Sequence, residues 1–191
     1  YNSAFLLAPD GKTMARYDKM HLVPFGEFVP MQNFLGKWIE VLNQLGGFDG
    51  GKSISVLNMP PFKLGVTICY ESIFPELVRR QVLEGAEVLV NITNDGWYLD
   101  TAAPAQHFDM CAMRAIENGR YLARCANTGI SGIVGPSGHV TGRTSLNTRT
   151  LLTQPVSAIR RQTFYTKHGN AFAGLCALVS AGAIIAGIRR K

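Results

Sequence analysis

The sequence predicts an α/β domain followed by one membrane-spanning helix. Apolar runs of strand length alternate with segments of helical periodicity, which is the pattern of a layered α/β fold. Residues 171–188 contain no charged side chain and are long enough to cross a bilayer as a helix. We therefore expect one domain over residues 1–165, and a transmembrane helix with a short basic tail over residues 166–191.

The first part of the chain begins with a hairpin pattern. Apolar runs over residues 4–8 and 13–17 flank the sequence Pro9-Asp10-Gly11-Lys12, whose residue types favour a tight turn. Apolar residues at intervals of three and four positions then predict a helix over residues 34–45. The glycine-rich segment over residues 46–51 interrupts this pattern, so we expect a flexible loop there.

The middle and last parts alternate strands and helices. Residues 64–69 form a continuous apolar run, which is typical of a strand buried on both faces. Pro75 opens a helical pattern that Gly85 ends, and Gly119 ends a second one over residues 103–118. A turn is expected at residues 94–97. The remaining strands are expected over residues 87–92, 121–126, 130–134, 139–142 and 151–159.

Charge and cysteine spacing argue against several classes of protein. The net charge of +6 is scattered apart from three basic residues at the end, and no basic stripe is interleaved with aromatic residues. Nucleic acid is therefore not an expected partner. The four cysteines include no CxxC pair, so neither a zinc site, nor a dithiol redox motif, nor a disulfide framework is predicted.

The apolar segment over residues 171–188 has two interpretations. It can be the core helix of a globular domain or a membrane span, and its helical length of about 27 Å suits a span. Arg189, Arg190 and Lys191 follow it directly, as basic residues often flank a span. Positive charge beside a span favours the cytoplasmic side. Three basic residues also precede the span, at positions 160, 161 and 167, so the count is equal on both sides and only the direct adjacency of the last three favours a cytoplasmic tail.

Cys69 is the strongest candidate for chemistry. It ends the buried strand over residues 64–69, and the helix that Pro75 opens starts six residues later. A thiol beside a helix N-terminus and a cation has a lowered pKa and becomes a good nucleophile. The alternative is that Cys69 is a small buried apolar residue. That structural interpretation is favoured for Cys111 and Cys125, which lie within a predicted helix and strand.

Lys19, Glu27 and Glu71 are the charged candidates for the same site. Lys19 can be a solvated loop residue, or a fixed cation that lowers the pKa of the thiol and stabilises an oxyanion. Glu71 can favour the positive end of a helix. Either glutamate can also hold Lys19 or shape the mouth of the pocket, and the local sequence does not separate these roles.

Other catalytic arrangements have weaker support in the sequence. The four histidines, at positions 21, 107, 139 and 168, are candidates for a Cys–His pair, although structural or surface roles are favoured. The sequence contains no G-x-S-x-G nucleophile elbow, no glycine-rich phosphate loop and no cluster of metal ligands. We therefore expect neither a metal nor a cofactor.

Several motifs together resemble the nitrilase, or carbon–nitrogen hydrolase, superfamily and, within it, the apolipoprotein N-acyltransferase family. They are YDKMHLVPFGE at residues 17–27, ICYE at 68–71, NDGW at 94–97 and NTGI at 127–130. The similarity covers almost the whole chain. It implies the C-terminal part of a nitrilase-like α-β-β-α sandwich, followed by one transmembrane helix.

The resemblance also implies roles for individual residues. Lys19 and Cys69 match the lysine and the nucleophile of a Glu-Lys-Cys triad, and Glu27 and Glu71 match further acidic residues of the catalytic site. Tyr70, Trp97 and His107 are expected to contact the substrate. The triad glutamate is expected upstream of Tyr1, so the chain is expected to be a C-terminal fragment that is inactive alone.

The implied reaction is acyl transfer between two lipid substrates. Cys69 would take an acyl chain from a phospholipid as a thioester and pass it to the N-terminal amine of a diacylglyceryl-cysteine apolipoprotein. The resemblance further implies the inner membrane of a bacterium, with the catalytic domain facing the periplasm. Two alternatives stay open: an amidase that uses the same residues on a small amide, and an inert membrane-anchored module.

Overall fold

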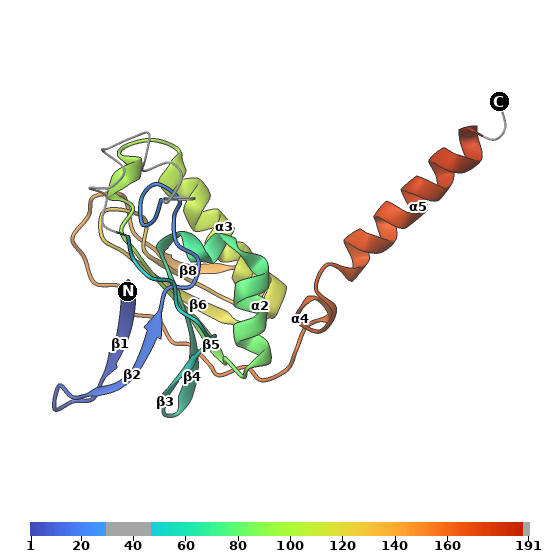
Figure 1. Ribbon diagram of the computed structural model, residues 1–191. Coiled ribbons are helices and arrows are strands. Elements are labelled where there is room, and N and C mark those ends of the chain that lie inside the picture. The colour runs from blue at the N-terminus through green and yellow to red at the C-terminus, as the bar shows by residue number, and fades with distance from the viewer. Residues whose placement is uncertain (30–46, 189–191) are drawn as a thin grey trace.

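A computed structural model of the chain describes residues 1–29 and 47–188 (Figure 1). Its centre is a six-stranded sheet with the strand order β3-β4-β5-β6-β7-β8, and strands β1 and β2 form a separate hairpin. The strands are β1 (Ser3–Leu7), β2 (Thr13–Asp18), β3 (Val56–Met59), β4 (Phe62–Ile68), β5 (Val88–Thr93), β6 (Tyr121–Ala126), β7 (Gly132–Val134) and β8 (Val140–Arg143). The helices are the 3₁₀ segments η2 (Cys69–Ile73) and η3 (Gly96–Tyr98) and the α-helices α2 (Pro75–Leu83), α3 (Ala103–Asn118), α4 (Phe164–His168) and α5 (Ala171–Ile188).

The three central strands are parallel and determine where a site can form. β4 pairs with β5, and β5 with β6, in parallel, whereas the outer pairs are antiparallel. Helices α2 and α3 make the two crossovers that parallel neighbours require. Because parallel strands end at one edge of a sheet, Cys69 after β4 and Asp95 after β5 come to the same edge.

Helices α2 and α3 cover one face of the sheet. The core beneath them includes Val82, Leu89, Phe108, Leu122 and Val134, each at most 2 % exposed. Proline lies in the first turn of both helices, and each is followed by a glycine with positive φ, 100° at position 85 and 60° at position 119. These are ordinary start and stop signals, and they confirm the two helices that the sequence predicts.

The opposite face of the sheet carries the β1–β2 hairpin. Ala4 and Tyr17 of the hairpin pack in one buried cluster with Leu57, Val66 and Ile68 of the six-stranded sheet. The hairpin therefore forms a second layer over β3 and β4, on the face opposite the helices, whereas Cys125 of β6 is exposed. This layering confirms the expected α/β fold.

The prediction of a strand over residues 151–159 is wrong. The segment makes no ladder within the described part of the chain, although Ile159 donates a backbone hydrogen bond to the carbonyl of Glu87 at 3.4 Å. Pro155 has no N–H to give to a ladder. The side chains of residues 151–159 mostly alternate between exposed and half-buried, because the extended segment lies on the domain without pairing in the sheet.

Strand β3 and helix α4 were not predicted from the sequence. Strand β3 is antiparallel to β4, and α4 packs against α2 and α3, where Thr166 is fully buried and donates to the amide oxygen of Asn118 at 3.1 Å. The helix predicted over residues 34–45 lies outside the described residues.

Helix α5 projects away from the domain (Figure 1). Its residues, Ala171–Ile188, have a mean hydropathy of 2.2, and none of the helix is buried against the domain. By length and composition it is able to cross a membrane. Exposed apolar surface of this extent is unfavourable in water, which agrees with the span predicted from the sequence. The basic tail lies beyond the described residues.

Candidate active site

Cys69 occupies a constrained position at the end of β4. It is the first residue of η2, it is half-buried, and its φ is +53°, in the left-handed region that residues with a side chain rarely adopt. Such a conformation costs about 1–3 kcal/mol and persists only where the surroundings fix it. The turn therefore presents the thiol at the strand end with its backbone held in place.

Two side chains hold the backbone carbonyl of Cys69. The hydroxyl of Ser72 and the amide nitrogen Nδ2 of Asn91 each donate to this oxygen at 3.2 Å. Ser72 comes from η2 itself and Asn91 from the neighbouring strand β5. The carbonyl is thus tied both to its own turn and to the sheet.

Glu71 joins the cysteine turn to the segment that carries Lys19. Its side chain is fully buried, and one carboxylate oxygen accepts from the backbone nitrogen of Met20 at 2.6 Å and of His21 at 3.1 Å. The same oxygen accepts from the hydroxyl of Tyr17 at 2.9 Å, and the other accepts from the nitrogen of Ile68 at 2.8 Å. Burial, with the charge of Glu71 as the next cause, raises the pKa of Tyr17 above its ordinary value.

Lys19 forms a buried ion pair with Glu27. Its ammonium nitrogen lies 2.7 Å from Oε2 of Glu27, and the two side chains are 1 % and 13 % exposed. Glu27 also accepts from the backbone nitrogen of Val23 and from the amide of Asn2, both at 2.8 Å. Burial opposes ionisation of Glu27, but these hydrogen bonds and the charge of Lys19 outweigh it and hold its pKa below 4.5.

Residues 47–51 contact the segment that carries Lys19 and Glu27. The backbone nitrogen of Gly51 donates to the carbonyl of Lys19 at 2.7 Å, and that of Phe48 donates to the carbonyl of Glu27 at 2.8 Å. A Cβ at position 51 would overlap the carbonyl of Asp18, so only glycine permits this close approach. The described part of the loop over residues 46–51 is therefore fastened to the backbone of the ion pair.

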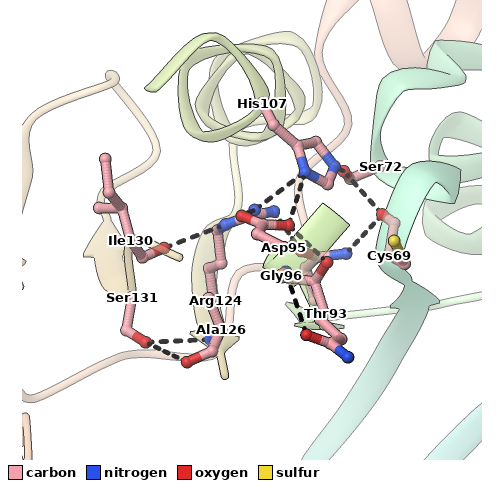
Figure 2. Close-up of polar contacts among 12 residues, drawn as sticks. Cys69, Ser72, Thr93, Asp95, Gly96, His107, Arg124, Ala126, Ile130 and Ser131 are labelled. Carbon is pink, nitrogen blue, oxygen red and sulfur yellow. Dashed lines mark hydrogen bonds and ion pairs between the residues drawn. The ribbon is translucent and has the colours of Figure 1, made fainter. Parts of the chain in front are cut away.

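A buried ionic cluster lies beside the cysteine turn (Figure 2). Arg124 of β6 pairs with Asp95 at 2.7 Å, and both side chains are fully buried. Nδ1 of His107 lies 3.1 Å from the other oxygen of Asp95, and its Nε2 lies 3.1 Å from the hydroxyl of Ser72. Burial opposes ionisation of Asp95, but His107 and Arg124 more than compensate and keep its pKa below 3.8.

The sequence did not point to several members of this cluster. Ser72, Asn91, Asp95 and Arg124 were not singled out as site residues. A charged Arg124 in the middle of a strand was the available signal, because a buried arginine requires partners. His107 was expected to contact substrate, but it is 4 % exposed and both ring nitrogens face groups of the protein.

The other two predicted substrate contacts lie at the surface of the site. Tyr70 follows Cys69 in η2 and packs edge-on against Phe74, with ring centroids 5.5 Å apart. Trp97 lies in η3, after β5, with 89 % of its surface exposed. An exposed tryptophan is available to an apolar ligand.

Among the described residues, the structure gives no support to Cys111 as a nucleophile or to a metal site. Cys111 is fully buried, and burial raises the pKa of its thiol, so it is poorly suited to nucleophilic attack. Within residues 1–29 and 47–188, no group of three or more His, Cys, Asp or Glu side chains is arranged to hold a metal ion.

Two relatives that are similar to this chain in sequence are both named apolipoprotein N-acyltransferase. Apolipoprotein N-acyltransferase of Geobacter metallireducens is 43 % identical over 192 residues, which cover all of this chain and 36 % of that protein. The enzyme of the same name from Bradyrhizobium diazoefficiens is 40 % identical over 196 residues, covering all of this chain and 35 % of the relative. The chain thus spans little more than a third of the length of these relatives.

Solved structures share the fold. An amidase from Nesterenkonia sp. AN1, with acrylamide added to its active-site cysteine, is 25 % identical with a TM-score of 0.55, over 76 % of this chain and 53 % of that one. A carbon–nitrogen hydrolase from Helicobacter pylori G27 is 20 % identical with a TM-score of 0.60, over 78 % and 54 %. The family model of the carbon–nitrogen hydrolases matches residues 1–164, so the chain belongs to the carbon–nitrogen hydrolase family.

Proposed function

We propose that this chain is part of an apolipoprotein N-acyltransferase. In this proposal it moves a fatty acyl chain from a phospholipid, through a thioester on Cys69, to the N-terminal amine of a diacylglyceryl-cysteine lipoprotein. The observation that carries the proposal is Cys69 at φ +53°, linked through Glu71 to the segment that bears the buried Lys19–Glu27 pair. The similarity to two enzymes of that name supports it.

The first half of the reaction forms the thioester. The sulfur of Cys69 attacks the ester carbonyl carbon of the phospholipid, and the thiol proton passes to a glutamate base that the family resemblance implies outside these 191 residues. The buried ammonium of Lys19 provides a fixed positive charge for the oxyanion of the tetrahedral intermediate. The C–O bond then breaks, and the lysophospholipid leaves with the proton.

The second half transfers the acyl chain. The free amine of the lipoprotein cysteine attacks the thioester carbon, and the base accepts a proton from this amine. The C–S bond breaks, an amide forms, and the thiol of Cys69 is regenerated with that proton. Splitting the transfer into two steps allows two lipid substrates to use one site in turn.

The apolar helix supports membrane substrates. Helix α5 is exposed along its whole length and long enough to cross a bilayer, which keeps the domain beside its lipids. We propose that the protein lies in the inner membrane of a bacterium, with this domain in the periplasm. Nothing in the proposed reaction requires a metal or a cofactor.

The test is the intact mass of the full-length protein after incubation with phosphatidylethanolamine in detergent. We expect an added acyl mass that hydroxylamine removes, that maps to Cys69, and that Cys69→Ala abolishes while Cys111→Ala retains it. No adduct on the wild-type protein would overturn acyl transfer. If that protein hydrolysed small amides, the amidase interpretation would replace it.

A further inference from the structure

A closed ring of hydrogen-bonding side chains begins and ends at the carbonyl of Cys69 (Figure 2). One branch runs from this oxygen to the Ser72 hydroxyl at 3.2 Å, from there to Nε2 of His107 at 3.1 Å, and from Nδ1 to Asp95 at 3.1 Å. Asp95 then pairs with Arg124 at 2.7 Å.

The second branch closes the ring through the sheet. Arg124 donates to the side-chain oxygen of Asn91 at 2.5 Å, and the amide nitrogen of Asn91 donates to the Cys69 carbonyl at 3.2 Å. Asn91 and Arg124 are direct neighbours in the parallel pairing of β5 with β6. The ring therefore links the cysteine turn, α3 and two strands.

We propose that His107 and Asp95 are positioning residues for the nucleophile, acting through Ser72 on the backbone of Cys69. This inference rests on the proposed role of Cys69 as the nucleophile. It differs from the substrate contact expected for His107, because the ring nitrogens face Ser72 and Asp95 and leave no polar atom of the imidazole for a ligand.

The available protons determine the direction of the hydrogen bonds in this closed network of side chains. A serine hydroxyl has one proton, and Ser72 donates it to the Cys69 carbonyl, so Ser72 must accept from Nε2–H of His107. The other imidazole nitrogen, Nδ1, lies 3.1 Å from Oδ1 of Asp95 and 3.1 Å from Nη2 of Arg124, so with the imidazole proton on Nε2 it accepts from Arg124. The carboxylate of Asp95 is held in turn by Arg124 and by the hydroxyl of Thr93 at 2.9 Å. The imidazole orientation is thereby fixed, and with it the hydroxyl that holds the turn.

The need for such a ring follows from the backbone of Cys69. At φ +53° the turn relaxes unless its carbonyl is held, and relaxation moves the sulfur. A displacement of about 1 Å at a reacting atom can cost ~100-fold in rate. Thr93 and Cys69 are half-buried, and the other members of the network are buried, so water does not substitute readily for a lost partner.

The experiment uses the full-length protein and two readouts. The first is acyl transfer, separated into kcat and KM. The second is the rate at which iodoacetamide alkylates Cys69 across a pH series, followed by peptide mass, which requires no substrate. The variants are Ser72→Ala and His107→Leu, with Ser72→Thr as the variant that keeps the hydroxyl, and Asp109→Asn on the exposed side of α3 as the control.

We expect Ser72→Ala and His107→Leu to lower kcat by ~100-fold with KM within about two-fold, and to change the rate and pH profile of Cys69 alkylation. Ser72→Thr should restore most of both readouts, and Asp109→Asn should match the wild type. Wild-type alkylation in both Ser72→Ala and His107→Leu would overturn the proposal. So would a Ser72→Thr protein that is as impaired as Ser72→Ala.

The two readouts keep this inference separate from the proposed function. If the wild-type protein forms no acyl adduct but the variants alkylate differently from it, the ring positions Cys69 and the acyl-transfer proposal fails. If the adduct forms and alkylation is unaffected by the variants, the proposed function stands and the positioning role fails.

Discussion

A carboxylate oxygen of Glu71 lies 2.6 Å from the backbone nitrogen of Met20, although the two residues are 51 positions apart in the chain. Met20 directly follows Lys19, and Glu71 lies two residues after Cys69. This one contact therefore fixes the segment of the candidate lysine against the turn of the candidate nucleophile. Burial of Glu71 makes the link strong, because a hydrogen bond to a buried charge is worth more than one at the surface.

Replacing Glu71 by glutamine should separate these two segments. Glutamine keeps the size of the side chain, but its amide NH₂ group donates hydrogen bonds. That group would face backbone N–H groups that now donate to the Glu71 carboxylate. We expect Glu71→Gln to lower the free energy of unfolding by about 2–3 kcal/mol and to abolish thioester formation on Cys69. Chemical denaturation and acyl-adduct mass measure the two effects. Near-normal stability with full adduct formation would show that the link is dispensable.

The Lys19–Glu27 pair leads to a second prediction. Glu27→Gln removes the carboxylate but leaves the Lys19 charge in a site where that side chain is 1 % exposed. An unpaired buried charge costs about 3–5 kcal/mol, so the domain should lose much of its stability as well as its activity. Unfolding by denaturant is the measurement.

The matched control is the pair between Lys12 and Asp10 in the β1–β2 turn. It has a similar length, 2.9 Å, but its side chains are 83 % and 53 % exposed. Exposed pairs contribute little, so Asp10→Asn should leave stability and activity at the wild-type level. Equal losses in Glu27→Gln and Asp10→Asn would contradict a special role for the buried pair.

The carboxylates also predict how stability responds to acid. The folded-state pKa of Glu27 lies below its ordinary value of 4.5, and that of Asp95 lies below 3.8. Their contribution is therefore complete above the ordinary values and is lost as the pH falls through the lowered ones. We expect the free energy of unfolding to fall between about pH 5 and pH 3, with a smaller slope in Asp95→Asn and in Glu27→Gln. An unchanged slope in both variants would exclude these two groups as the cause.

Local signals in the sequence were sufficient for most of the fold. The helix over residues 103–118 and the strand over residues 121–126 have the bounds that the sequence predicts. Pro104 and Gly119 mark the ends of the helix, and the strand is apolar apart from Arg124. Cys69 was correctly expected at the end of a buried strand. The segment over residues 151–159 was misassigned because an extended segment can lie on a domain without pairing in its sheet, and the local sequence does not distinguish the two cases.

The ionic cluster could not be predicted in the same way. Asn91 and Arg124 meet only because β5 and β6 pair in one particular register, and His107 reaches Asp95 only because α3 crosses above both strands. Register and crossover depend on the packing of the whole sheet, which no local pattern in a single sequence specifies. The left-handed backbone of Cys69 is likewise a result of its surroundings rather than of its residue type.

Trp97 provides a prediction about substrate binding. Its side chain is 89 % exposed in η3, so removing it should change the free energy of unfolding by less than about 0.5 kcal/mol. If it contacts the acyl chain, Trp97→Ala should raise KM for the phospholipid by about ten-fold, equivalent to 1.4 kcal/mol. Leu151→Ala is the control, because Leu151 is equally exposed but follows β8. Equal KM values in wild type and Trp97→Ala would remove Trp97 from the binding surface.

The last prediction concerns helix α5 and the side of the membrane on which the domain lies. Val179 is near the middle of Ala171–Ile188, about 12 Å from the nearer end at 1.5 Å per residue, whereas Asp109 is exposed on α3. In full-length protein, a membrane-impermeant maleimide should label Asp109→Cys in right-side-out vesicles but should not label Val179→Cys in vesicles of either orientation. Labelling is located by peptide mass. A thiol within the hydrocarbon is shielded from the reagent, so reaction at position 179 would contradict a membrane span. Reaction at position 109 only in inverted vesicles would place the domain in the cytoplasm.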